Sequence, residues 1–158
     1  MVSLQRLLAA SGLLAAALIS NPLPGQAAPL NPFQIGLNGS MPPGTVGVDL
    51  AFTVPLGKTL VIEYTSGDCF VPSGQFCVFH ISTQVFVSAQ DNEKVTAQFN
   101  LDTDNVGAEQ KIGKDLWRAA QQVLLYASGG TVVTFHVGRN DDTGSASPIF
   151  ASLSGHLE

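Results

Sequence analysis

The stretch TVGVDLAFTV, residues 45–54, decides the fold class of this chain. Valine, leucine or phenylalanine occupies every even position from 46 to 54, and small or polar residues occupy the odd positions. Side chains of a β-strand alternate between its two faces, so this period of two predicts a strand with one buried face. Residues 94–101, KVTAQFNL, repeat the pattern with apolar residues at the odd positions. The chain therefore contains at least two clear amphipathic strands.

Further strands are predicted on both sides, because β-branched runs recur about every ten residues with proline, glycine or asparagine between them. This spacing predicts an all-β protein, either an antiparallel two-sheet sandwich or a jelly-roll-like fold, with about seven to nine strands. Residues 121–127 belong to one of these strands. Residues 102–119 form the longest stretch without a strand pattern, and residues 111–122 could hold one or two helical turns.

The first 27 residues have the features of a secretory signal peptide. Arg6 provides a positive start, residues 7–19 form a short apolar run, and small residues occupy positions 25 and 27. We predict cleavage after Ala27 and a protein that is secreted or periplasmic. A helix that spans a membrane needs about 20 apolar residues, so no membrane insertion is expected after cleavage.

The remaining 131 residues are long enough for one domain of ordinary size. Residues 28–43 are rich in proline, asparagine and glycine, and only Phe33, Ile35 and Leu37 alternate. We predict that they form an extended N-terminal arm with one short strand at most. Residues 44–158 are predicted to form a single β-sandwich domain.

The charge of the chain disfavours two classes of partner. Without Arg6, six basic residues remain against twelve acidic ones, a net charge of −6. An acidic surface repels phosphate backbones and anionic lipids, so neither nucleic acid nor a membrane surface is expected as a partner. Only 12% of the residues are charged, about half of the usual share. Such a surface suits neutral ligands or contact with copies of the same chain.

Cys69 and Cys77 are the two cysteines, and in an exported chain they predict one disulfide bond. The sequence between them is symmetric about Ser73, which favours a tight hairpin with Cys69 opposite Cys77 and Phe70 opposite Phe76. In that hairpin the cysteines fall at a hydrogen-bonded pair, whose side chains stand farther apart than a disulfide prefers. Either the register slips near the turn, or the disulfide ties an irregular loop.

Residues 102–107, DTDNVG, place oxygen-bearing side chains close together. Hard cations prefer clustered oxygen ligands, so one interpretation is a weak calcium site. Its candidate ligands are Asp102, Asp104, Asn105 and Glu109. The helix-loop-helix calcium pattern is not met, because Val106 stands at a ligand position and Gly113 replaces the bidentate glutamate. The alternative is an Asx-rich turn, and no other cofactor is predicted.

Catalytic patterns are weak in this sequence. The histidines are predicted on the polar sides of strands, where they could share a face and bind zinc, or remain isolated surface residues. They are His80, His136 and His156. Asp49 and Glu63 lie on predicted polar faces and could approach as a carboxylate pair for glycoside hydrolysis. No serine-hydrolase motif is present, so catalysis is not the favoured interpretation.

Four aromatic residues are candidates for a platform that stacks on sugar rings, although core packing would account for them equally. They are Phe70, Phe76, Trp117 and Tyr126. Export, few charges and clear strands lead us to expect a non-catalytic β-sandwich domain that binds a neutral glycan or a protein partner. The alternative is a structural protein that assembles into homo-oligomers through strand edges. A small secreted hydrolase is the third hypothesis.

Overall fold

The computed structural model describes residues 31–88, 92–109 and 113–158, which form nine β-strands and no helix. The strands are β1 (Asn31–Met41), β2 (Gly47–Thr53), β3 (Thr59–Pro72), β4 (Cys77–Phe86), β5 (Lys94–Leu101), β6 (Asp104–Glu109), β7 (Lys114–Ser128), β8 (Val132–Arg139) and β9 (Ser147–Leu157). The predicted signal peptide lies outside the described residues. Within the described part, the chain has no helix of the length and apolarity that crossing a membrane requires.

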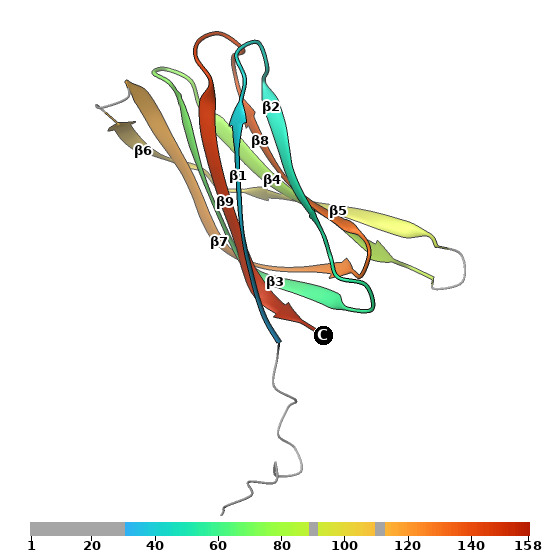
Figure 1. Cartoon of the computed structure of the whole chain (residues 1–158). Helices are drawn as coiled ribbons and strands as arrows, with labels where there is room; N and C mark the ends of the chain where they lie inside the picture. Colours follow the sequence, from blue (N-terminus) through green and yellow to red (C-terminus); the bar gives the residue numbers. More distant parts are fainter. Residues whose placement is uncertain (1–30, 89–91, 110–112) are drawn as a thin grey trace, which may run out of the picture.

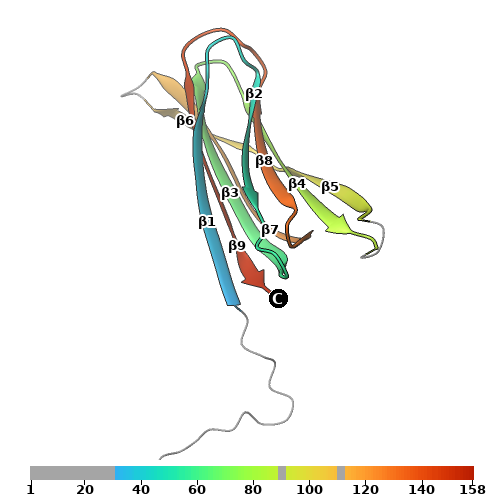
Figure 2. The ribbon, with the colours of Figure 1, turned by 45° about the vertical axis from the view of Figure 1, so that its right-hand side comes forward.

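Two sheets face each other (Figures 1 and 2). One has five strands in the order β1-β9-β3-β7-β6, and the other has four in the order β2-β8-β4-β5. Every neighbouring pair is antiparallel. The predicted antiparallel two-sheet sandwich is therefore confirmed, at the upper end of the predicted number of strands.

The core fills the space between the sheets. Phe79 of β4 and Phe135 of β8 meet edge to face with ring centroids 6.0 Å apart, and both side chains are buried. Gly67 of β3 lies opposite them, and a Cβ at this position would stand 2.9 Å from Cζ of Phe135. The missing side chain of Gly67 therefore makes room for the two rings.

Residues 31–41 form a longer strand than the one short strand expected at most within the predicted arm. They form β1, which pairs with β9 over all eleven residues and belongs to the five-stranded sheet. Alternate side chains face the core, and Phe33 stacks on Phe52 of β2 with centroids 5.6 Å apart. The alternation of Phe33, Ile35 and Leu37 indicated only a short strand, because Gly39 occupies the next inward position and interrupts the apolar pattern.

Residues 102–119 are not the irregular stretch that we predicted. They contain β6 and the first half of β7, so the suggested helical turns within 111–122 are absent from the described residues. The predicted strand at 121–127 is the second half of β7. Its first half carries charged side chains, and one of them, Arg118, forms an ion pair with Asp68 of the neighbouring strand β3. These charges concealed the strand pattern.

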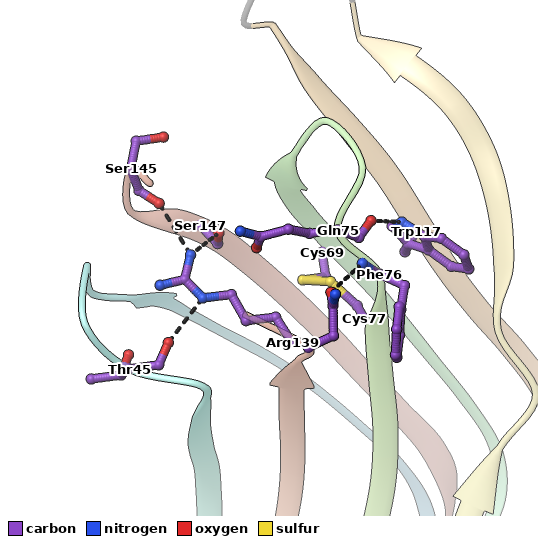
Figure 3. The surroundings of a disulfide bond; sticks show 10 residues. Thr45, Cys69, Gln75, Phe76, Cys77, Trp117, Arg139, Ser145 and Ser147 are labelled. Atoms are coloured by element: carbon purple, nitrogen blue, oxygen red, sulfur yellow. Dashed lines mark hydrogen bonds between the residues drawn. A yellow bond between two sulfur atoms is a disulfide. The ribbon is translucent and has the colours of Figure 1, made fainter. Parts of the chain in front are cut away.

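The disulfide bond joins the two sheets (Figure 3). Cys69 lies in β3 of the five-stranded sheet, Cys77 begins β4 of the four-stranded sheet, and both are fully buried. The predicted hairpin is wrong, because β3 already pairs with β7 and β9 while β4 pairs with β5 and β8. The second alternative, an irregular loop tied by the disulfide, describes this crossing. Closing a loop of about nine residues stabilises the fold by about 2–3 kcal/mol.

Candidate binding site

A β-bulge in β3 determines which side chains face outward. The register of β3 shifts between Ile62 and Tyr64 against both of its neighbours. Glu63 is an extra residue relative to β9, whereas β7 places two residues, Val123 and Leu124, opposite Glu63. Before the bulge the even positions point to the core, as Ile62 does, and after it the odd positions do, as Thr65 does. The bulge therefore places Tyr64, together with the even residues that follow, on the outer face of the five-stranded sheet.

Three cross-strand rows occupy that outer face. The middle row has small residues and follows from the pairing registers: Gly36, Ser152, Ser66 and Ala120. The row on one side contains Asn38, Phe150, Asp68 and Arg118, and the row on the other side contains Gln34, Ser154, Tyr64 and Gln122. We call these three rows the candidate face. Successive residues rise about 3.3 Å along a strand, so the two outer rows stand about 13 Å apart.

The middle of the candidate face is hollowed. A shallow open depression of about 190 Å³ is lined by Ser66, Gly67, Asp68, Phe150, Ala151 and Ser152. At its floor the hydroxyl oxygens of Ser66 and Ser152 lie 2.8 Å apart in a hydrogen bond. Open space continues to the neighbouring strand, because a Cβ on Gly36 would meet no atom within 4 Å.

Two exposed aromatic rings flank the middle row. Phe150 is 51% exposed in one outer row, and Tyr64 is 41% exposed in the other. Phe150 is supported from the side by Phe70, which meets it edge to face with centroids 6.4 Å apart. Large apolar rings left in water beside a polar depression are typical of a binding surface.

An ion pair beside the depression removes most of its charge. Arg118 donates two hydrogen bonds to the carboxylate of Asp68, at 2.7 and 3.2 Å. The hydrogen bonds and the negative charge of Asp68 raise the pKa of Arg118. The pair presents fixed donors and acceptors with little net charge, which suits a neutral polar ligand.

The four predicted aromatic residues do not form one platform. Phe70 and the 46% exposed Tyr126 lie on the outer face of the five-stranded sheet, at opposite ends of it. Phe76 and Trp117 meet edge to face at 6.2 Å beside the disulfide, where Trp117 Nε1 donates to the carbonyl of Gln75 at 2.9 Å (Figure 3). The predicted pair of Phe70 with Phe76 is wrong, because the two rings have different partners.

Tyr64, Phe150 and the two serines were missed at the sequence level. Residues 149–154, IFASLS, do show the period of two of a strand, with Phe150 and the two serines at the even positions. Counting back from a core-facing Cys69 would also have placed Ser66 and Asp68 outside. The register between β3 and β9, which brings these side chains together, has no signal in the sequence.

The predicted calcium ligands lie along an edge strand. Asp104, Asn105 and Glu109 belong to β6 and Asp102 precedes it, while the side chain of Glu109 lies outside the described part of the chain. Asn105 Oδ1 accepts a hydrogen bond from the amide of Gly107 at 2.8 Å, as in an Asx turn. Among the described residues, no group of three or more histidine, cysteine, aspartate or glutamate side chains is arranged to hold a metal ion.

Two of the three histidines share a face of the four-stranded sheet. His80 and His136 are cross-strand neighbours and stack with centroids 4.4 Å apart, and His136 Nδ1 lies 2.6 Å from Oδ1 of Asp49. His156 belongs to the other sheet, where its ring nitrogens lie 3.4 Å from Glu63 and 3.5 Å from Glu158.

The two sheets also separate the carboxylates that we considered for glycoside hydrolysis. Asp49 belongs to β2 of the four-stranded sheet, whereas Glu63 belongs to β3 of the five-stranded sheet. Their predicted approach across one sheet is therefore wrong, because their strands do not share a sheet.

Acidification is expected to destabilise the fold through His80. Burial lowers the pKa of His80 below its ordinary value of 6.5, the neighbouring His136 lowers it further, and Asp49 opposes both. The unfolded chain therefore binds this proton more readily than the folded chain, so stability is lost as the pH falls below 6.5. Urea unfolding at pH 7.5 and pH 5 should show a smaller loss of stability for His80→Asn than for the wild type. Equal losses in both proteins would contradict this prediction.

Comparison with known proteins does not indicate a function. No protein-family model matches the chain, and none of the curated proteins is significantly similar to it. The candidate face must therefore be interpreted from its own chemistry.

Proposed function

We propose that this protein is an exported, non-catalytic β-sandwich module that binds a neutral glycan on the outer face of its five-stranded sheet. The observation that carries the proposal is the polar depression lined by Ser66, Ser152 and the exposed Phe150, with a second exposed ring, Tyr64, on the other side of the middle row. A glycan chain offers both apolar ring faces and hydroxyl groups. The candidate face offers the matching partners, because its rings can stack and its hydroxyls and amides can hydrogen-bond.

Charge and shape both favour this ligand class. The only charged residues in the three rows are Asp68 and Arg118, and they neutralise each other. A strongly anionic or cationic ligand would therefore have to break their ion pair. The depression is shallow and open, which suits one stretch of a longer chain better than an enclosed small molecule.

Export is part of the proposal. It rests on the sequence of residues 1–27, with cleavage after Ala27, and on the buried Cys69–Cys77 disulfide. Disulfides persist in oxidising compartments, so the bond supports a secreted or periplasmic location. A domain with few charges and a polar binding face would meet extracellular or cell-envelope glycans there.

The two flanking rings provide the test. Affinity electrophoresis in gels that contain neutral glucans, xylans, mannans or galactans should reveal at least one polysaccharide that retards the protein. Tyr64→Ala and Phe150→Ala should each weaken that binding about tenfold, because each removes one exposed ring from the candidate face. Circular dichroism should be unchanged, since both side chains are on the outer surface.

Phe76→Ala is the matched control, because Phe76 is 44% exposed but lies at the disulfide end of the molecule. It should bind as the wild type does. Loss of binding in Phe76→Ala with retention in the other two variants would move the site to Phe76 and Trp117. No retardation by any polysaccharide in the panel would contradict the proposed function.

A further inference from the structure

The edge strand β5 is the least protected of the four sheet edges. An edge usually avoids pairing with other chains by being short, bulged or covered. Strand β6 is short and has a register shift at Gly107, whose φ is 115°. The edges β1 and β2 lie close together, where Phe33 stacks on Phe52. Strand β5 has eight residues, no proline, no glycine and no register shift against β4.

The inner side of β5 leaves apolar surface uncovered. Figures 1 and 2 both show the β4–β5 pair extending away from the five-stranded sheet toward the end where these two strands connect. Val95 is 50% exposed, Ala97 is exposed and Phe99 is half-buried, although all three point to the core side. Among the described residues, β5 pairs with β4 alone, so the four-stranded sheet ends in an edge that carries exposed apolar side chains.

We infer that β5 pairs with β5 of a second copy of this chain, giving a two-fold symmetric dimer with a continuous eight-stranded sheet. A two-fold axis makes such edges meet antiparallel. Directly opposed residues then lie on the same face of the sheet. The register must therefore place even-numbered residues opposite even-numbered ones and odd-numbered residues opposite odd-numbered ones. With Gln98 on the axis, Val95 faces Leu101 and Ala97 faces Phe99 on the inner face.

Charge complementarity selects this register. With Gln98 on the axis, Lys94 of each copy lies opposite Asp102 of the other, which gives two ion pairs at the ends of the interface. Both side chains are exposed, and Lys94 Nζ stands above the Phe86 ring, 5.1 Å from its centroid. Shifting the register by one allowed step places Lys94 opposite Asn100 in one direction. In the other direction it places Lys94 opposite Asp104, which belongs to β6 of the other sheet and does not continue β5. The candidate face lies on the other sheet, so this inference does not depend on the proposed glycan binding.

Charge reversal tests the pairing. Sedimentation velocity over a concentration series of the purified exported protein should show a reversible dimer. Lys94→Glu and Asp102→Lys should each raise the dissociation constant about tenfold, because each creates two like-charge pairs. The double variant restores both ion pairs, and its dissociation constant should return to within about threefold of the wild type. Exposed positions were chosen so that folding is preserved, which circular dichroism can verify.

The other outcomes overturn the inference. A monomer at every concentration would exclude the dimer. A dimer insensitive to both single variants, or one not restored in the double variant, would exclude this register. Crosslinking gives an independent check, because a short bis-maleimide should join Gln98→Cys to its symmetry mate across the axis. Thr96→Cys, whose symmetry mate lies four residues along the strand, about 13 Å away, should not be joined.

Discussion

Replacing Arg139 by methionine is expected to lower the free energy of unfolding by at least about 3 kcal/mol. Arg139 is only 4% exposed, at the end of β8 beside the disulfide (Figure 3). Its Nε donates to the carbonyl of Thr45 at 2.9 Å, and Nη2 donates to that of Pro42 at 3.0 Å. The same guanidinium also donates to the carbonyls of Asp142 and Ser145 and to the hydroxyl of Ser147.

This effect is large because one side chain satisfies acceptors in two separate loops. Methionine fills a similar space but has no donor, so the part-buried carbonyl groups of both loops and the buried Ser147 hydroxyl lose this partner. Arg118→Met is the control, because Arg118 makes an exposed ion pair with Asp68. This substitution should lower the free energy of unfolding by less than about 1 kcal/mol. Urea unfolding of the two variants measures the contrast. Similar losses for both would show that Arg139 does not join the loops in the way described.

Replacing Gly155 by alanine is expected to lower the free energy of unfolding by at least about 3 kcal/mol, the second large effect. Gly155 of β9 lies opposite Ile62, at the bulge of β3. A Cβ on Gly155 would stand 1.9 Å from the carbonyl oxygen of Val61, and a backbone atom cannot move aside as a flexible side chain can. The bulge must therefore shift or the two strands must separate.

Gly36→Ala is the matched control for Gly155→Ala. Gly36 lies in β1, which also pairs with β9, but a Cβ there meets no atom within 4 Å. Its stability should stay within about 0.5 kcal/mol of the wild type. Because the bulge also positions Tyr64, Gly155→Ala should weaken polysaccharide binding even under conditions where the variant is folded. A fully stable Gly155→Ala variant would contradict the geometry of the bulge.

The strand periodicity gave the fold class because some strands bury one face without interruption. The stretch at 45–54 is such a case, and its apolar positions do face the core from Leu50 to Val54. The pattern failed in β3, where the extra residue Glu63 changes the parity within one strand. It also failed in the first half of β7, where charged side chains such as Arg118, which pairs with Asp68 of β3, interrupt the apolar pattern.

The candidate site was less predictable than the fold. Its rings, Tyr64 and Phe150, are 86 positions apart in the sequence. The pairing of β3 with β9 places them on the same face of the sheet. Strand order is a property of the whole chain, and no local spacing reports it. Two of the four predicted aromatic residues, Phe70 and Phe76, were expected to pair across the cysteine hairpin. The symmetry of residues 69–77 suggested a hairpin, but the chain uses this segment to cross between sheets.

The most direct measurement of the central proposal is a nitrogen–proton NMR titration with an oligosaccharide of whichever neutral polysaccharide retards the protein. Binding on the candidate face predicts that the largest shift changes fall on the amides of Gly36, Ser66, Ala120 and Ser152 and on those of the flanking rows. Shift changes gathered at Phe76 and Trp117, or on the histidine side of the four-stranded sheet, would contradict the account.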